Sequence, residues 1–381
     1  MDILAADRGD NPTHIRIKMP ADLHHHFRMG VRTQLIAPMV AKRFWLALEM
    51  PNHKPPITTV AHMDDHGREV VDASGGKLRV LKTLYLTSSL SPLEVEQACK
   101  DPDFAGIKYY PAGLTTNSDE GVADPTELWT KRTKAYDCLK VLADHDKALL
   151  LHGADGFARQ TVQVRTRTYN KGDELDAYDQ EPHFVAHSLP ELIEAHPTLK
   201  KSFEHMSTGE GAEFLDKHGG EKLGCGLTPQ HMLTDRRDTH RKGLRPHNFW
   251  FPAPQALEHR QEINRFAGKG YYFCWLASDS AMHLKKDKES ACCSGGVITA
   301  HAGIELYVEA FEAIGALDKL EDFASVNGPR FYGIEPSERT IELKKEPWRV
   351  KDLFFVDDPE DGLEPVHPFR LGEMVYWKLA A

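Results

Sequence analysis

Short apolar runs alternate with helical segments along most of this chain, and no other feature constrains its fold as much. The apolar or β-branched runs lie near residues 15–19, 44–50, 79–86, 104–109, 148–152, 201–206, 223–228 and 271–277. Segments of helical pattern lie between or after them at 92–100, 126–145, 209–218, 254–267 and 301–316. Strands that alternate with helices form parallel sheets, and eight strands over roughly 270 residues predict a (β/α)8 barrel of the TIM type.

The composition is that of a globular protein whose partner is a small molecule. The chain has 381 residues, of which 41% are hydrophobic, enough for one barrel-sized core. Its formal net charge of −10 comes from interspersed acids and bases, so we expect neither a nucleic-acid surface nor a membrane-binding patch. The first residues resemble no targeting signal and no apolar run could span a bilayer, which predicts a cytoplasmic location.

The chain lacks the repeats, low-complexity tracts and Pro/Gly linkers that would divide it. We therefore predict a leader segment over residues 1–13 and one barrel domain over 14–335. A polar C-terminal extension over 336–381 should pack on the barrel, ending in the short strand-like piece GEMVYWKL.

Reactive side chains collect where the predicted strands end. The runs finish in HHHFR, PN, TSS, KYYP, HG, EH, TPQH and SDS. Barrels of this type carry their active sites at the C-terminal ends of the strands. The sequence therefore predicts one site built from several strand ends.

The histidine triplet in ADLHHHFR is the densest of these groups. Residues 14–19 alternate polar and apolar as a strand does. If extended geometry continues, one face carries Asp22, His24, His26 and Arg28. The middle histidine then points the other way. Two imidazoles at this spacing suit a first-row metal such as zinc, and the alternative is a group of solvated loop histidines.

Later strand ends supply His152, His205 and Asp279. Each of them alone is more often a capping or core residue than a ligand. Together with the triplet they make four imidazoles and one carboxylate at one barrel mouth. A single zinc ion takes three or four ligands, so this number favours two metals.

Lys108 lies between apolar and aromatic residues on a central predicted strand, in IKYY. Its ammonium group would either reach the surface at the end of an extended side chain, which is the commoner outcome, or enter the barrel mouth. Near two metals, a deprotonated lysine could react with CO2 to form a carbamate. That group is an anionic bridging ligand.

Nine ordered motifs resemble those of dihydroorotases of the single-domain bacterial and fungal type, within the amidohydrolase superfamily. They are HHHFR, MPNHKPPITT, IKYYPAGLTTNSDEGV, LLLHG, FEHMST, LTPQH, GLRPHNFWFP, SDSAMHLKKDKESACC and SVNGPRFYGI. The resemblance implies reversible cyclisation of N-carbamoyl-L-aspartate to (S)-dihydroorotate, a step of pyrimidine biosynthesis, and a homodimer. It also implies a binuclear zinc site.

The metal ligands are implied by the same resemblance. The more buried zinc would be held by His24, His26 and Asp279, and the more exposed zinc by His152 and His205. A carboxylated Lys108 and a hydroxide would bridge the two ions. Asp279 would also serve as general base and then general acid.

Substrate contacts follow in the same way. Arg28 would bind the dihydroorotate carboxylate through two N–H donors of its guanidinium group. The other implied contacts are Asn52 and His283 at that carboxylate, backbone groups of Phe251 and Gly295 at the ring, and Thr115 and Thr116 in a mobile loop that closes over the substrate.

The chain departs from the family pattern in three places. Met282 replaces a common proline, Gly113 differs from the usual residue, and the stretch near Cys292 is only partly retained, so Gly295 is assigned to within about one position.

Two other functions stay open: another binuclear cyclic-amide hydrolase such as a hydantoinase, or a catalytically silent scaffold. Arg28 and Asn52 favour a carboxylate-bearing substrate over a hydantoin. Retention of all six implied ligands disfavours the scaffold.

Overall fold

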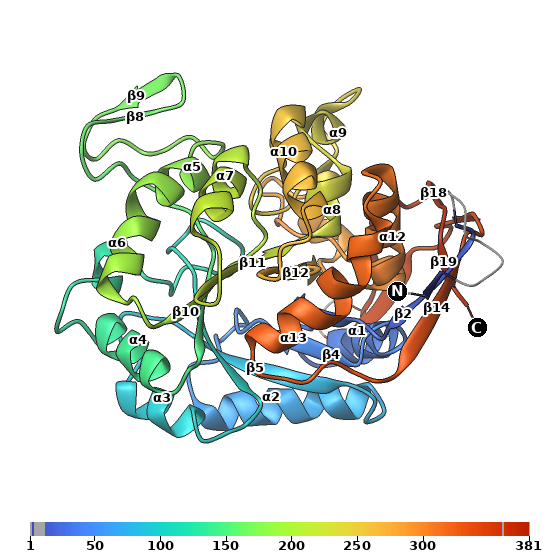
Figure 1. Ribbon diagram of the computed structural model, residues 1–381, viewed down its shortest axis with the longest axis horizontal. Coiled ribbons are helices and arrows are strands. Elements are labelled where there is room, and N and C mark those ends of the chain that lie inside the picture. Colours follow the sequence, from blue (N-terminus) through green and yellow to red (C-terminus); the bar gives the residue numbers. More distant parts are fainter. Residues whose placement is uncertain (1, 4–11, 360–361, 381) are drawn as a thin grey trace.

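A single curved parallel sheet closes into a barrel (Figure 1). The structure is a computed structural model that describes residues 2–3, 12–359 and 362–380. The sheet begins with β12 (Cys274–Leu276) and ends with β13 (Ser280–Ala281), and only residues 277–279 separate these two strands in the chain. They therefore share the eighth strand position, and β13 closes the ring by pairing with β3 (Ala21–His26). The predicted (β/α)8 barrel is confirmed.

Strands and helices alternate around the barrel. After β3, the strands are β4 (Leu46–Glu49), β5 (Arg79–Tyr85), β6 (Phe104–Tyr109), β7 (Ala148–Leu151), β10 (Lys200–Phe203) and β11 (Leu223–Leu227), followed by β12 and β13. The main helices between and after them are α1 (Val31–Ala41), α2 (Val60–Ala73), α3 (Pro92–Ala98), α4 (Lys134–Asp144), α6 (Leu189–Ala195), α7 (Gly209–His218), α10 (Leu257–Gly268) and α12 (Gly303–Ala313). Shorter helical turns are α5 (Gln180–His183), α8 (Pro229–Leu233), α9 (Arg236–His240), α11 (Lys285–Lys288), α13 (Asn327–Phe331), η1 (Pro125–Leu128), η2 (Phe184–Ser188), η3 (Pro246–Asn248), η4 (Ala300–Ala302), η5 (Leu317–Lys319) and η6 (Asp322–Val326).

The first barrel strand lies one element later than predicted. β2 (His14–Lys18) covers most of the predicted run 15–19, but it pairs antiparallel with β14 (Thr340–Lys344), outside the barrel. Pro20, which has no N–H to continue a ladder, lies between β2 and β3. The histidine triplet therefore belongs to a barrel strand of its own.

The helix predicted over 126–145 is wrong in its first half. Arg132 adopts a φ of 75°, which is outside the helical region and interrupts the segment. The next residue, Thr133, accepts a hydrogen bond from Tyr136 N and starts α4 there. Only the short turn η1 forms before this point.

Apolar side chains fill both faces of the barrel sheet. One cluster lies inside the barrel and includes Leu23, Leu48, Leu81, Leu150, Trp275 and, from α13, Phe331. A larger cluster packs the outer face of the strands against the surrounding helices. Because the interior is packed, the barrel is no open pore, and its polar groups gather at one end.

Segments from both ends of the chain meet in a separate antiparallel sheet. Its order is β1 (Asp2–Ile3), β2, β14 and β19 (Lys378–Leu379). The remaining two-stranded ribbons are β8 (Val162–Val164) with β9 (Arg167–Tyr169), β15 (Trp348–Arg349) with β18 (Met374–Val375), and β16 (Phe354–Asp358) with β17 (Gly362–Val366). Most of the predicted leader lies outside the described residues. The boundaries at residues 13 and 335 stay predictions.

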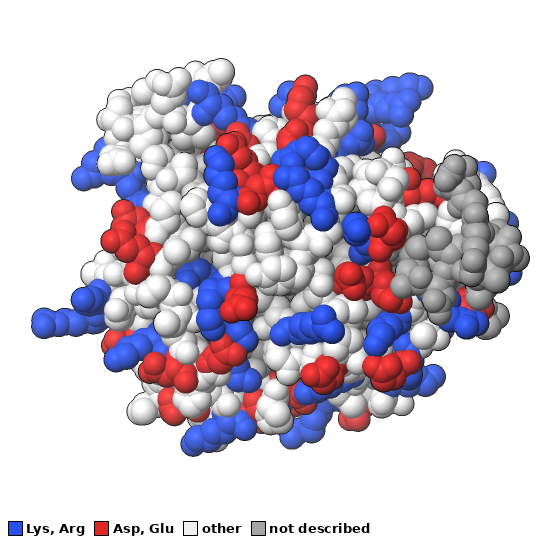
Figure 2. Space-filling model, viewed as in Figure 1, with Lys and Arg blue, Asp and Glu red and all other residues white. Residues whose placement is uncertain are grey.

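Charged side chains of both signs are interspersed over the face shown in Figure 2. On this face, no field of a single sign covers the surface. Within the part of the chain that the structure describes, no helix is long and apolar enough to cross a membrane.

Candidate active site

A small cavity lies at the C-terminal ends of the barrel strands. Its lining contains the predicted site residues His24, His26, Arg28, Asn52, Thr115, Thr116, His152, His205, Phe251, Asp279 and Gly295. Tyr110, Ala281 and Gly296, which the sequence did not single out, complete the lining. The other two predicted residues lie beside it: Lys108 is fully buried within electrostatic range of the imidazoles, and His283 contacts Arg28.

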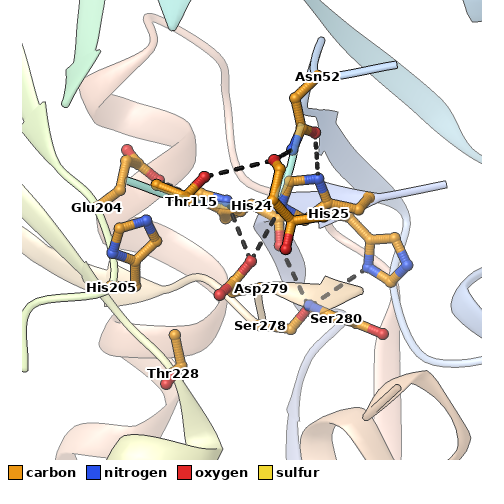
Figure 3. A network of polar contacts seen from close by, with 12 residues as sticks. His24, His25, Asn52, Thr115, Glu204, His205, Thr228, Ser278, Asp279 and Ser280 are labelled. Carbon is orange, nitrogen blue, oxygen red and sulfur yellow. Dashed lines mark hydrogen bonds and ion pairs between the residues drawn. The ribbon is translucent and has the colours of Figure 1, made fainter. Parts of the chain in front are cut away.

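The four imidazoles and Asp279 form one continuous group, part of which Figure 3 shows. Asp279 Oδ1 lies 3.0 Å from His26 Nε2 and 3.4 Å from His24 Nε2. On the other side, His152 Nδ1 lies 3.1 Å from His205 Nε2. The rings of His24 and His205, with centroids 5.2 Å apart, connect the two pairs. This donor set is larger than one zinc ion uses.

Burial leaves these imidazoles neutral. Desolvation, and after it the charge of Lys108, holds the pKa of His24, His152 and His205 well below the usual value for histidine. A neutral imidazole keeps the lone pair that a metal requires. Among the described residues, His205 Nδ1 is buried and has no hydrogen-bond partner, so this nitrogen is available to bind a metal ion.

Lys108 is the most unusual buried group in the site. Its side chain is fully buried and its Nζ has no hydrogen-bond partner among the described residues. Burial lowers the pKa of this amine to about 8, against the opposing charges of Glu204 and Asp279. The alternative in which Lys108 reaches the surface is excluded by this position.

A break in strand alternation turns the histidine pair inward. Leu23 belongs to the cluster inside the barrel, so strict alternation would send His24 and His26 outward. The register of β3 against β4 shifts between Asp22 and His25, as at a β-bulge, and this reverses the alternation.

The same shift corrects the expectation for Asp22, which does not share the face of the metal-type histidines. Its Oδ2 lies 2.8 Å from His25 Nδ1, and Ser278 Oγ donates a 2.5 Å hydrogen bond to the same oxygen. The middle histidine is therefore a structural residue held by Asp22.

A second shift turns Lys108 inward. Ala105 belongs to the inner cluster, so alternation would place Ile107 inside and Lys108 outside. The pairing of β5 with β6 shifts register after Lys82, and Ile107 packs in the outer cluster instead. Lys108 then points toward the cavity end of the barrel.

Three site residues have left-handed backbone conformations that non-glycine residues rarely adopt. The φ angles are 67° at Arg28, 41° at His205 and 47° at Asp279. Each such conformation costs on the order of 1–3 kcal/mol and persists only where the surroundings hold it. Strain at three residues of one cavity marks it as a functional site.

Glu204 is a site residue that the sequence analysis missed. Its Oε2 lies 2.5 Å from His24 Nδ1, and its other oxygen accepts a hydrogen bond from Ser202. Burial raises the pKa of Glu204 to about 7. A carboxylate behind an imidazole fixes its ring and tautomer, as is common behind metal ligands. The sequence feature that could have indicated Glu204 is its position directly before His205 in FEHMS.

Asn52 also holds a histidine. Its Oδ1 lies 2.8 Å from His26 Nδ1, and its Nδ2 donates a 3.0 Å hydrogen bond to Thr116 O. Thr116 Oγ1 in turn donates to Gly295 O over 3.0 Å. The loop that carries Thr115 and Thr116 therefore lies across the cavity and contacts two of its walls.

Arg28 brings a buried cation to the cavity wall. Its Nη2 lies 3.3 Å from His283 Nε2, and its Nε donates weakly to Met282 O over 3.4 Å. Its Nη1 is buried with no hydrogen-bond partner among the described residues. A guanidinium with a free donor in a cavity is suited to an anionic ligand.

Comparison with known proteins gives relatives over nearly the whole chain. The dihydroorotase of Azoarcus sp. (strain BH72) is 38% identical over 370 residues, covering 96% of this chain and 99% of the relative. That of Aromatoleum aromaticum is 36% identical over 368 residues, with the same two coverages. No protein-family model matches the sequence.

Solved structures agree with these relatives. A dihydroorotase from Saccharomyces cerevisiae, in complex with 5-fluoroorotic acid, has a TM-score of 0.84 at 24% identity, covering 97% of this chain and 98% of that one. A dihydroorotase from Campylobacter jejuni has a TM-score of 0.80 at 26% identity, with the same coverages. An L-hydantoinase from Arthrobacter aurescens is less similar, with a TM-score of 0.69 at 17% identity, covering 96% of this chain and 82% of that one.

Fold and site together define a barrel enzyme of the amidohydrolase superfamily. Its histidines and aspartate at the strand ends include a group, His24, His26 and Asp279, with the spacing of metal ligands. The identity over nearly the full length is more specific: the chain belongs to the dihydroorotase family. Members of this family are metal-dependent hydrolases of cyclic amide bonds.

Proposed function

We propose that this protein is a zinc-dependent dihydroorotase that interconverts N-carbamoyl-L-aspartate and (S)-dihydroorotate in pyrimidine biosynthesis. The observation that carries the proposal is that Arg28 lines the same small cavity as four neutral imidazoles and Asp279. A carboxylate-binding cation beside a metal-type donor set is what a cyclic amide that bears a carboxylate requires. The expected partner is this small molecule, and no nucleic acid.

We assign two zinc ions to the donor set. The ligands would be His24, His26 and Asp279 for the more buried ion and His152 and His205 for the more exposed ion. When bound, such ions lower the pKa of water from 15.7 to about 7 and polarise the amide carbonyl. The neutral state of the imidazoles and the free Nδ1 of His205 support this assignment.

Lys108 is proposed to carry the bridging carboxylate. A neutral amine adds to CO2 and loses one proton, and the product is an anionic carbamate. The burial of Lys108, its lowered pKa of about 8 and the absence of a hydrogen-bond partner for its Nζ among the described residues support this reaction. A permanent ammonium at this position would repel the cations that the histidines bind.

Asp279 moves the proton in the proposed mechanism. Its Oδ1 faces the two histidines of the buried pair, at the cavity wall. In the hydrolytic direction the carboxylate accepts a proton from the attacking water and then donates it to the ring nitrogen that leaves. In the biosynthetic direction the ureido nitrogen attacks the side-chain carboxyl group, and the same carboxylate runs these transfers in reverse.

The remaining residues bind and enclose the substrate. Arg28 and His283, in contact with each other, would hold the carboxylate together with Asn52. Backbone groups of Phe251 and Gly295 would hold the ring, and the loop with Thr115 and Thr116 would exclude water after binding. The hydrogen bond from Thr116 to Gly295 supports a loop that reaches across the cavity.

The direct test is turnover of dihydroorotate, followed by its change in ultraviolet absorbance near pH 8. We expect turnover that is lost on chelation and returns with zinc, and two zinc equivalents per chain in the active protein. Activity in a preparation with a reproducible zinc content near zero would contradict the metal assignment. A metal-loaded protein without turnover would favour the scaffold alternative.

A hydantoinase is the nearest alternative activity, because hydantoinases share the fold. Hydantoin lacks the carboxylate that would pair with Arg28, so binding would leave a buried cation without its partner. We therefore expect dihydroorotate to be turned over at least about 100-fold more efficiently than hydantoin, which competing-substrate assays measure. Comparable efficiencies would assign the chain to the hydantoinases by activity.

A homodimer, which the family resemblance implies, and a cytoplasmic location, which the sequence analysis predicts, both stay predictions. Light scattering of the purified protein measures the first, and cell fractionation the second. A monomer at micromolar concentration would contradict the predicted dimer.

A further inference from the structure

A second group of metal-type side chains lies outside the barrel, between β4 and α2. It consists of Glu49 at the end of β4, His53 in the following loop and His66 on α2, and one potential ligand atom of each lies within 4.8 Å of the others. All three side chains are buried, and none of them lines the catalytic cavity. The catalytic mechanism does not use them.

The geometry of this group repeats that of the catalytic one. His53 Nε2 lies 2.8 Å and His66 Nε2 lies 3.1 Å from the same oxygen, Glu49 Oε1. In the barrel, two imidazole Nε2 atoms face Asp279 Oδ1 in the same manner. Two imidazoles and a carboxylate oxygen directed at one point are a donor set that first-row divalent metals prefer.

Neighbouring groups hold these side chains in place. His66 Nδ1 lies 3.2 Å from Glu69 Oε2, so a carboxylate orients the ring from behind, as it does for many metal-binding histidines. Glu69 itself accepts a hydrogen bond from Gly30 N over 2.6 Å. The second oxygen of Glu49 accepts one from Phe27 N over 3.2 Å.

The group also attracts positive charge. Burial alone would lower the pKa of His66, but the carboxylates of Glu49 and Glu69 outweigh burial and raise this pKa to about 9. His53, by contrast, is neutral, because burial lowers its pKa to about 4. A cation between Glu49 and His66 is therefore favoured by the surroundings, and either a proton or a metal ion would supply it.

We propose that Glu49, His53 and His66 bind one divalent transition metal ion, zinc by the character of the donors, at a site separate from the catalytic one. Three protein ligands leave one position of a tetrahedral ion for water. The site would join β4, the loop after it and α2. It would also brace Glu49, whose carboxylate holds the backbone of Phe27 next to Arg28.

A path for the ion is present. His53 lines a surface cavity together with Lys54, Asp119 and Glu120. The two carboxylates outnumber the single ammonium group, so the net charge of the lining favours the approach of a cation. The buried group is thus connected to solvent through one of its own ligands.

The test is a comparison of zinc stoichiometry between variants of the full-length protein, dialysed to equilibrium against buffered zinc. We expect His66→Gln to bind one zinc equivalent fewer than the unchanged protein. The matched control, His62→Gln, changes a histidine on the same helix that is not part of the group, and it should keep the full count. Equal counts for the unchanged protein and His66→Gln would overturn the proposal.

Two further measurements keep the test decisive. Circular dichroism verifies that His66→Gln is folded, and His53→Gln takes its place if it is not. Crystals of the unchanged protein, with data collected at the zinc absorption edge, should show an anomalous peak about 2.0–2.2 Å from the nitrogen and oxygen ligands of the group. If the electron density at this point has no anomalous peak, or if there is no density, then a proton on His66 supplies the positive charge between Glu49 and His66. In either case the proposal fails. The difference in zinc stoichiometry between the variants does not depend on the ions in the barrel. It can therefore be interpreted even if the proposed catalytic site is wrong.

Discussion

Burial shifts individual residues beside the candidate active-site cavity toward their uncharged forms. Lys108 and Glu204 are both fully enclosed, and burial lowers the pKa of the amine to about 8 and raises that of the carboxyl group to about 7. The histidines beside them are neutral for the same reason. A cavity of neutral donors binds a doubly charged ion without first having to lose several protons.

Asp279→Asn should separate proton transfer from folding. Asparagine tolerates the left-handed backbone at this position, where φ is 47°, so the fold should persist. An amide cannot accept the proton, and general acid–base catalysis is worth about 10²–10⁴-fold, so we expect kcat to fall by that factor. Steady-state kinetics measures this, with circular dichroism as the control for folding and zinc content as the control for metal binding, and full activity in the variant would remove Asp279 from the mechanism.

Arg28→Met should weaken binding of both reactants. Both carry the carboxylate that Arg28 is proposed to grip, and a charge-assisted hydrogen bond is worth about 1.5–3 kcal/mol, so we expect KM to rise about 10- to 100-fold in each direction.

The matched control is Arg32→Met, which removes an arginine paired with Asp358 away from the cavity. It should leave KM within about two-fold of the original value, since surface ion pairs contribute little. An unchanged KM in Arg28→Met would assign the substrate carboxylate to another group.

At the level of elements, the site depends on irregular strands. Regular alternation in β3 and β6 would send His24, His26 and Lys108 to the helix side of the sheet. One register shift in each pairing turns them inward. Bulges occur often beside active sites because they redirect side chains in this manner.

Gly106 is the residue that permits the irregular path of β6. Its φ is 152°, and a Cβ there would lie 1.8 Å from Ala148 O on the neighbouring strand. We therefore expect Gly106→Ala to lower the unfolding temperature strongly, to reduce zinc content and to displace Lys108. Thermal unfolding and metal analysis measure these effects.

Gly75→Ala is the control for this prediction. Gly75 also has a positive φ, of 67°, but nothing lies within 4 Å of the position of its Cβ. Its substitution should cost only about 1 kcal/mol of conformational strain and leave zinc content unchanged. Equal effects of the two substitutions would mean that contact with β7 is not what makes Gly106 necessary.

At the level of the whole molecule, His301 lies where the C-terminal strands meet the barrel helices. It is buried beside Trp348 and Phe354, with ring centroids 6.5 Å and 5.9 Å away. Burial, and after it the charge of Arg43, lowers the pKa of His301 to about 3. The contact therefore requires the neutral ring.

Protonation of this histidine should make the molecule acid-sensitive. The unfolded chain binds a proton below about pH 6.5 that the folded protein accepts only near pH 3, so the free energy of unfolding falls as the pH decreases between these values. We expect His301→Phe to reduce the slope of the unfolding free energy against pH by up to about 1.4 kcal/mol per pH unit in this range. Denaturant unfolding at several pH values measures it. The exposed His218→Phe should keep the original slope, and an unchanged slope in His301→Phe would assign the acid sensitivity to other groups.

The sequence by itself determined the alternation of strands and helices, and with it the barrel and the face on which reactive residues gather. These features are local, because side-chain period and turn residues act over a few positions. Only the tertiary structure decided that Asp22 faces away from the metal-type pair, that Lys108 points inward and that Glu204 supports His24, a residue 180 positions distant in the chain. It also moved the first barrel strand from 15–19 to Ala21–His26. Register between neighbouring strands depends on partners distant in sequence, so no local pattern specifies it.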